Sequence, residues 1–152
     1  MSRAIALDLD GALCDTRQLW RDWLTAAEAV LEFDPRELPA DRAEAGAELD
    51  RRGAGNWRTL LGRWTEERAP VYFRRDARTS ATLRALEASG CEIGVFTDAP
   101  ESLAQIALSH VGAERRISAL ETGADARERV LRRLGPDAIV VETRDELFRL
   151  EP

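Results

Sequence analysis

Four short apolar segments along the chain predict the strands of a buried sheet. They span residues 4–7, 91–96, 117–120 and 138–141. Each is a nearly continuous apolar run, which is typical of strands covered on both faces. The fourth is rich in β-branched residues and follows a turn signal, Gly135, Pro136 and Asp137.

Helical periodicity predicts helices between and after these strands. The expected helices span residues 80–88, 100–111, 124–134 and 144–150. Strands that alternate with helices favour a parallel sheet with right-handed crossovers and helices on both faces. The pattern therefore predicts an α/β fold.

One long segment, residues 16–78, interrupts this alternation and has helical spacing throughout. Two sets of residues recur every three or four positions, and each forms an apolar stripe: Trp20, Trp23, Leu24, Ala27 and Leu31, then Trp57, Leu60, Leu61 and Trp64. Pro35 and Pro39 separate the helices, and Asn56 is expected to cap the third. All four Trp residues lie here, and their spacing favours the core of a small helical bundle over a platform that stacks on a substrate.

Length and composition narrow the class of protein. The chain has 152 residues, 44% of them apolar and 33% charged, which fits one soluble globular core with a modest insertion. The formal charge of -6 repels phosphate backbones and anionic lipids, so neither nucleic acid nor a membrane is an expected partner. Two Cys and one His exclude the common zinc and disulfide frameworks. With no signal peptide recognisable, a cytoplasmic location is expected.

A pair of carboxylates follows the first predicted strand directly. Strand alternation puts Asp8 and Asp10 on the same side, at the carboxyl edge where parallel sheets bind ligands. Two carboxylates so close repel each other, which suits either a divalent metal or a nucleophile paired with a general acid. Gly11 then allows a sharp turn. The alternative is an acidic turn in which Asp10 or Asp15 only caps a helix.

A hydroxyl closes the second predicted strand. Thr97 can face the same crevice as Asp8 and donate a hydrogen bond to a phosphate oxygen. Alternatively, Thr97 and Asp98 cap the helix that starts near Pro100.

Taken together, these residues resemble the haloacid dehalogenase superfamily of phosphotransferases. The stretch 4–15 is similar to its first motif, an apolar strand followed by Asp-x-Asp-Gly-Thr-Leu, with Ala12 where Thr is usual. The stretch 96–100 is similar to its second motif, a Ser or Thr at the end of a strand. The resemblance implies a Rossmann-like three-layer core over residues 1–15 and 79–152, with a helical cap over residues 16–78 inserted between the two motifs.

The resemblance also implies roles for individual residues. Asp8 is the expected nucleophile that forms an aspartyl-phosphate, and Asp10 the expected acid and base. The acid at Asp10 fits phosphate-ester chemistry and disfavours dehalogenation. Mg²⁺ would be held by the Asp8 carboxylate, the Asp10 backbone carbonyl and an acid of a fourth motif. The expected phosphate-binding residues are Thr97, Asp98, Gly11 and Arg127.

The sequence departs from the family pattern at the third motif, which is a Lys. All 22 basic residues of this chain are Arg. Arg127 is the nearest cation in the matching stretch, with Arg115 and Arg116 farther away. A planar guanidinium is not a geometric copy of an ammonium, and a solvated surface charge is the alternative interpretation of Arg127.

The fourth motif departs as well. An apolar strand followed by Gly-Asp is expected, but Val141 leads straight into Glu142. Glu142 and Asp145 are the expected metal ligands there, with a helix cap or surface acid as the alternative for Glu142. Family members usually continue past this motif to a further strand, whereas this sequence stops at Pro152. We therefore expect a small sheet or, alternatively, a second subunit in a homodimer that covers the edge where that strand would pair.

Two hypotheses follow. The first is a magnesium-dependent phosphatase acting on a small phosphorylated metabolite. The second is a catalytically impaired relative that serves as a ligand-binding or protein-interaction module, because the missing Lys removes charge neutralisation at the phosphate. A receiver domain shares the acidic pair, but the helical insert and the missing Lys disfavour it.

Overall fold

A sheet of four parallel strands forms the centre of the protein, whose computed structural model describes residues 3–152. The strands are β1 (Ala4–Asp8), β2 (Glu92–Thr97), β3 (Ala119–Thr122) and β4 (Ile139–Val141), in the order β3-β2-β1-β4. All four predicted strands are confirmed. The third begins two residues later than predicted because Ile117 still closes a short 3-10 turn, η3 (Glu114–Arg116), with its N–H on the Glu114 carbonyl.

Helices cover both faces of this sheet, which makes the α/β fold Rossmann-like with three layers. One face packs against α4 (Ala77–Ala88), α5 (Glu101–Val111) and α7 (Arg144–Phe148), and the other against α6 (Ala126–Leu134). The predicted helices are confirmed with small shifts at their ends. Gly94 lets α6 approach closely, since a Cβ there would lie 2.8 Å from side-chain carbons of Val130 and Leu134.

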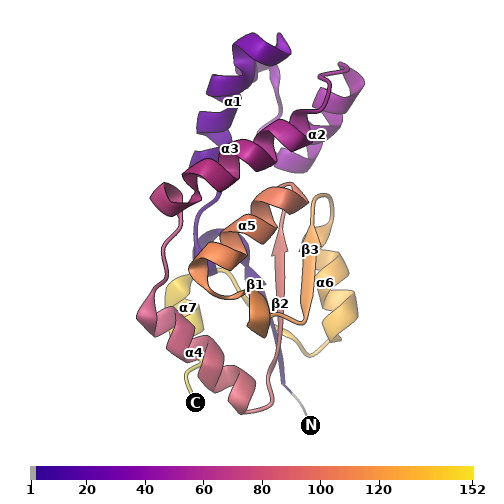
Figure 1. Cartoon of the computed structure of the whole chain (residues 1–152). Coiled ribbons are helices and arrows are strands. Elements are labelled where there is room, and N and C mark those ends of the chain that lie inside the picture. The colour runs from indigo at the N-terminus through magenta and orange to yellow at the C-terminus, as the bar shows by residue number, and fades with distance from the viewer. Residues whose placement is uncertain (1–2) are drawn as a thin grey trace.

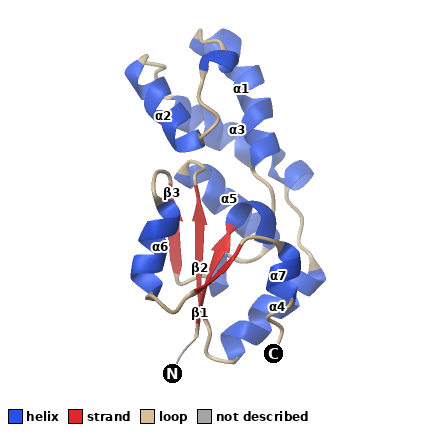
Figure 2. Ribbon diagram, turned by 180° about the vertical axis from the view of Figure 1, so that it is seen from behind, coloured by secondary structure: helices blue, strands red, loops and turns tan. Residues whose placement is uncertain are grey.

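The segment between β1 and α4 folds into helices that stand over the carboxyl ends of the strands. These are α1 (Arg17–Leu31), the short η2 (Pro35–Glu37), α2 (Arg42–Arg51) and α3 (Trp57–Tyr72). In Figure 1 they form a layer above the sheet, and in Figure 2 the strand arrows point toward them. The division into a core and a cap with limits at residues 16 and 78 stays a prediction.

The Trp residues of this helical layer form its core, as their spacing predicts. Trp20, Trp23 and Trp57 are buried, with ring centroids 5.4 to 6.2 Å apart. Trp64 is half-buried beside Tyr72. Asn56 occupies the N-cap position of α3, as predicted, but its side chain makes no capping hydrogen bond, because its ψ of 51° is not the extended conformation that such a cap requires.

Two further observations concern the whole described chain. Over residues 3–152, no helix combines the length and the apolar character that crossing a bilayer requires. Cys14 and Cys91 are both free thiols, in agreement with their interpretation from the sequence.

Candidate active site

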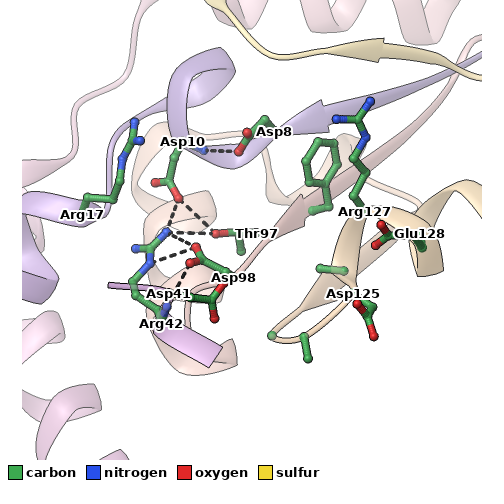
Figure 3. A pocket seen from close by; sticks show the side chains of 14 residues that line it. Asp8, Asp10, Arg17, Asp41, Arg42, Thr97, Asp98, Asp125, Arg127 and Glu128 are labelled. Carbon is green, nitrogen blue, oxygen red and sulfur yellow. Dashed lines mark hydrogen bonds and ion pairs between the residues drawn. The ribbon is translucent and has the colours of Figure 1, made fainter. Parts of the chain in front are cut away.

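A cleft of about 370 Å³ is lined by residues at the carboxyl ends of β1 and β2 and by residues of the helical layer. Figure 3 shows that side chains from both strands, from α1 and α2 and from the start of α6 surround it. Most residues expected at the site from the sequence line this cleft: Asp8, Asp10, Thr97, Asp98 and Arg127. Two arginines that the sequence did not single out, Arg17 and Arg42, line it as well.

Asp8 ends the first strand, and the chain turns immediately after it. Residues Leu9–Leu13 form a tight turn in which Asp10 and Gly11 are not helical and Gly11 has a φ of 119°. A Cβ at Gly11 would clash with the backbone carbonyl of Glu142, so the turn requires glycine both for its conformation and for its space. Gly11 therefore shapes the site through its backbone.

This turn separates the two carboxylates that strand alternation puts on one side. The strand ends before Asp10, so alternation no longer applies to that residue, and Asp10 points toward the helical layer while Asp8 faces the cleft. The two remain neighbours, because the backbone N–H of Asp10 donates to Asp8 Oδ1 at 3.1 Å.

Four donors surround the buried carboxylate of Asp10. Its Oδ1 accepts hydrogen bonds from the backbone N–H and the hydroxyl of Thr16, both at 2.7 Å. Its Oδ2 accepts from the Thr97 hydroxyl at 3.1 Å and from Nη2 of Arg42. Both oxygens of this carboxylate are thus occupied.

Arg42, the first residue of α2, is the buried cation of the site. Its side chain is only 2% exposed, and its Nη1 donates to the Thr16 hydroxyl at 2.6 Å. It also holds Asp98 through its backbone N–H, Nε and Nη2, at distances between 2.7 and 3.0 Å. Arg42 thus connects the first turn of α2 to the ends of β1 and β2 (Figure 3).

Sequence reasoning missed Arg42 because nothing marks it among 22 arginines. The available signal is Asp41, which caps α2 by accepting the N–H of Glu44 at 2.9 Å. That cap predicts where the helix begins, but not that its first side chain reaches the sheet.

Thr97 and Asp98 take different roles at the end of β2. The Thr97 hydroxyl donates to Asp10 and accepts the N–H of Ala99 at 3.2 Å, which stabilises the turn. Asp98 does not cap α5, whose first turn follows Pro100 without a side-chain cap. Asp98 instead binds Arg42.

The environment shifts the pKa values of the two carboxyls in opposite directions. Burial, followed by the negative charge of Asp10, raises the pKa of Asp8 from 3.8 to about 6, and Glu142 adds to the rise. For Asp10, burial also raises the pKa, but the charge of Arg42 and the hydrogen bonds from Thr16 outweigh it and lower the pKa below its ordinary value. At neutral pH, Asp10 is an anion paired with Arg42, whereas Asp8 is an anion without an ion pair within residues 3–152, and the more distant charge of Arg17 only partly offsets the rise in its pKa.

Of the residues expected from the later motifs, only Arg127 lines the cleft, whereas Glu142 and Asp145 do not. Arg127 lines the cleft, and its Nη1 is 3.5 Å from Oε1 of Glu142, with both side chains about half exposed. Asp145 is exposed in the first turn of α7 and does not line the cleft. Arg115 and Arg116 precede β3 and so lie at the opposite edge of the sheet, where Arg116 pairs with Glu87.

The donor set fits a magnesium ion held by few protein ligands. Within residues 3–152, His, Cys, Asp and Glu side chains nowhere gather in a group of three that would enclose a metal. Mg²⁺ commonly uses one or two carboxylates together with water and substrate phosphate oxygens. Asp8 lines the cleft, and its carboxylate accepts one hydrogen bond, so it can supply one such ligand. Glu142 lies outside the lining, and its part in a metal site, like that of the Asp10 backbone carbonyl, stays a prediction.

Comparison with known proteins establishes the fold. No protein-family model matches this sequence, and no curated protein matches it. Among solved structures, the chain is similar to CbbY from Rhodobacter sphaeroides in complex with phosphate, with 17% identity over 92% of this chain and 77% of that one, at a TM-score of 0.67. It is also similar to a haloacid dehalogenase-like family hydrolase from Streptococcus pneumoniae, with 17% identity over 91% and 74% of the two chains, at a TM-score of 0.57. The chain therefore has the fold of haloacid dehalogenase-like hydrolases.

Proposed function

We propose that this protein is a magnesium-dependent phosphatase that hydrolyses a small phosphate monoester through an aspartyl-phosphate at Asp8. The observation that carries the proposal is the state of Asp8, whose carboxylate ends a buried strand, faces the cleft and accepts one hydrogen bond, from the Asp10 backbone. Asp10 and Thr97 stand beside it. The similarity in fold to CbbY, whose structure contains phosphate, supports a phosphate group as the ligand.

In the first half of the reaction, an Asp8 carboxylate oxygen attacks phosphorus. The new Oδ–P bond forms as the P–O bond to the leaving alcohol breaks, and Asp10 gives its proton to the alcohol oxygen. In the second half, Asp10 takes a proton from water, whose oxygen then attacks the same phosphorus. Asp8 is released as a carboxylate, and inorganic phosphate leaves.

Arg42 supplies the positive charge that the chain lacks in the form of Lys. A phosphate in the cleft presents oxygens that compete with Asp10 and Asp98 for the guanidinium, and Arg binds phosphate oxygens in a bidentate manner. When Arg42 moves to the phosphate, Asp10 loses its cation and takes up the proton that it must later donate. This exchange prepares Asp10 at the moment the substrate arrives.

Asp8, Glu142 and the Asp10 carbonyl would hold the magnesium ion, which supplies neutralising charge for the phosphoryl oxygens. The chain's own contribution is an anionic pocket. Asp8 lies in the field of both Asp10 and Glu142, and a cation relieves that repulsion.

The alternative is a binding protein without catalysis, and one observation favours it. Arg127 and Glu142 pair with each other at 3.5 Å, which reduces the availability of both for phosphate and metal. The pair is half exposed, and solvent weakens it. It is therefore a weaker argument than the state of Asp8.

Hydrolysis of 4-nitrophenyl phosphate and of a panel of phosphorylated metabolites tests the proposal. We expect activity with Mg²⁺, loss of that activity with EDTA, and recovery when Mg²⁺ is restored. Asp8→Asn removes the nucleophile and should lower kcat by at least about a thousandfold. Asp125→Asn, which lines the same cleft, is the matched control and should retain activity. If the wild type and Asp8→Asn are equally inactive across the panel, the proposal that the protein is a phosphatase is wrong.

A further inference from the structure

A second hollow adjoins the cleft inside the helical layer. It has a volume of about 360 Å³, and its walls are formed by Trp20, Leu24, Pro35, Leu38 and Pro39. We call it the apolar recess. It lies between α1 and the segment around η2 and shares Arg17, Arg42 and Asp98 with the cleft that holds Asp8. The two hollows therefore meet at Arg42.

Most residues that line the recess are apolar. Of its four charged lining residues, Arg17, Arg42 and Asp98 also line the cleft, and only Arg21 belongs to the recess alone. The polar atoms of Arg42 bind Asp10, Asp98 and Thr16 in this structure, and a phosphate is proposed to take their place, so in neither state are they left for a group in the recess. A ligand group that enters the recess thus meets apolar walls with few hydrogen-bond partners.

The recess is preformed. Asp34 Oδ1 accepts the N–H of Arg36 at 2.9 Å, and the N–H of Leu38 donates to the Pro35 carbonyl at 3.2 Å, which fixes the η2 wall. Trp20 is buried against Trp23 and Trp57, so the opposite wall is fixed as well. A rigid apolar hollow favours binding because little conformational entropy is lost.

We infer that the apolar recess binds the leaving group, and that the substrate is the phosphate monoester of a hydrophobic alcohol or phenol. The inference rests on the proposed function: the phosphoryl group lies against Asp8 and the carbon skeleton extends past Arg42 into the recess. A sugar in the same place would bury hydroxyls without hydrogen-bond partners, and this loss of hydration free energy would weaken its binding. The volume of the recess is within the range of small-ligand sites.

The test separates binding from turnover. Methyl-, ethyl-, propyl- and butylphosphonate carry a C–P bond in place of the ester, so calorimetry measures their affinity without hydrolysis. We expect affinity to rise about three- to fourfold with each methylene that enters the recess. Equal affinity along the series for the wild type would overturn the inference.

Two variants test whether the rise in affinity with chain length arises in the recess. Leu38→Asn replaces a half-buried wall residue of the recess, and Leu60→Asn replaces a half-buried leucine of α3 outside it. Leu38→Asn should reduce the gain along the series to less than twofold per methylene, while Leu60→Asn retains the wild-type gain. If the affinity of Leu38→Asn rises with each methylene as much as that of the wild type, the inference is contradicted.

A second variant keeps the test decisive if Leu38→Asn does not fold. Ala40 lines the recess and is exposed, so Ala40→Phe fills the hollow with little expected effect on folding. It should weaken butylphosphonate about tenfold and methylphosphonate less than twofold. Equal loss for both ligands would contradict the inference.

Hydrolysis of methyl, ethyl, propyl and butyl phosphate, compared with phosphonate binding, distinguishes this inference from the proposed function. If phosphonate affinity rises with chain length but no ester is hydrolysed, the result supports ligand binding in the recess and contradicts the proposed phosphatase activity. If the esters are hydrolysed with a KM that is independent of chain length, the result supports the phosphatase activity and contradicts binding of the leaving group in the recess. If no phosphonate binds and no ester is hydrolysed, both are wrong.

Discussion

Asp8 and Asp10 enter the cleft from the same strand end, two residues apart, and lie in opposite environments. Asp10 is buried, with both oxygens bound by Thr16, Thr97 and Arg42. Asp8 lines the cleft, where burial and then the charge of Asp10 raise its pKa, and the opposing effect of Arg17 does not cancel the rise. The helical layer therefore supplies a cation to the Asp10 carboxylate and none that pairs with the Asp8 carboxylate.

The difference shows how two identical side chains acquire different chemistry. The Gly11 turn redirects the chain, so only Asp10 meets the first turn of α2. An unsatisfied carboxylate beside an open cleft is suited to attack and to metal binding, whereas a paired one holds a geometry. Each of the following changes removes one part of this contrast.

The largest effect is expected from Arg42→Met. It leaves Asp10 buried without its cation and releases Asp98, and breaking a buried pair on one side costs about 3–5 kcal/mol of stability. Urea unfolding at pH 7 measures the change. Arg42→Lys should recover part of the loss, because it restores the charge but not the fork. A loss of less than about 1 kcal/mol for Arg42→Met would mean that the pair does not hold the helical layer to the sheet.

Gly11→Ala should destabilise the fold by about 2 kcal/mol. The φ of 119° strains any other residue, and the added Cβ meets the Glu142 carbonyl. Because the turn separates Asp8 from Asp10, we also expect phosphatase activity to fall further than stability alone explains. Thermal unfolding and kcat, measured on folded protein, test both statements. Gly55→Ala, with a φ of 62° and open space around it, is the control for conformational strain without a clash.

Asp8→Asn should stabilise the protein at neutral and alkaline pH while it abolishes activity. The folded-state pKa of Asp8 is raised from 3.8 to about 6, so its contribution to stability is present below pH 4 and is lost as the pH rises through 6. Asn does not titrate. We expect a gain of about 1 kcal/mol at pH 8, smaller than the full shift implies because Asp8 is partly solvated, and no gain near pH 3.5.

Denaturant unfolding across that range checks the sign, and Asp10→Asn is the matched comparison. Since the pKa of Asp10 is lowered, Asp10→Asn should destabilise at pH 8, and this loss should shrink as the pH falls. If both substitutions change stability in the same direction at pH 8, the contrast between the two carboxylates is wrong.

The smallest effect is expected from Arg127→Met. Its pairing with Glu142 is 3.5 Å long and half exposed, so stability should change by less than about 0.5 kcal/mol. With Glu142 released, Mg²⁺ affinity should rise slightly, which calorimetry measures. A large loss of kcat with unchanged stability would instead assign Arg127 to the phosphate.

Much of the fold and part of the site can be predicted from the sequence, for local reasons. Apolar runs mark the strands, and the carboxyl edge of a parallel sheet brings Asp8 near Thr97 whatever the loops do. Asp10 fits this scheme less well, because alternation predicts its direction and the Gly11 turn changes it. Local pattern was sufficient where the backbone alone determines position.

Long-range contacts explain what the sequence did not predict. Arg42 reaches Asp10 across 32 positions, and only the packing of the helical layer on the sheet determines that contact. Asp145 has the residue type and spacing of a ligand, but α7 begins at Arg144 and places Asp145 in an exposed first turn. For both, side-chain direction depends on how elements pack, which residue type and spacing do not encode.

The central claim, that Asp8 is the reacting carboxylate and Asp10 its partner, is tested most directly by mass spectrometry on the Asp10→Asn variant. 4-Nitrophenyl phosphate has a leaving group that needs little protonation, so the first step proceeds while hydrolysis, which needs Asp10 as base, is slow. After acid quenching with Mg²⁺ present, the account predicts one added phosphoryl group on the peptide that contains Asp8, together with a stoichiometric burst of 4-nitrophenolate. Release of nitrophenolate with no phosphoryl group on Asp8 would contradict it.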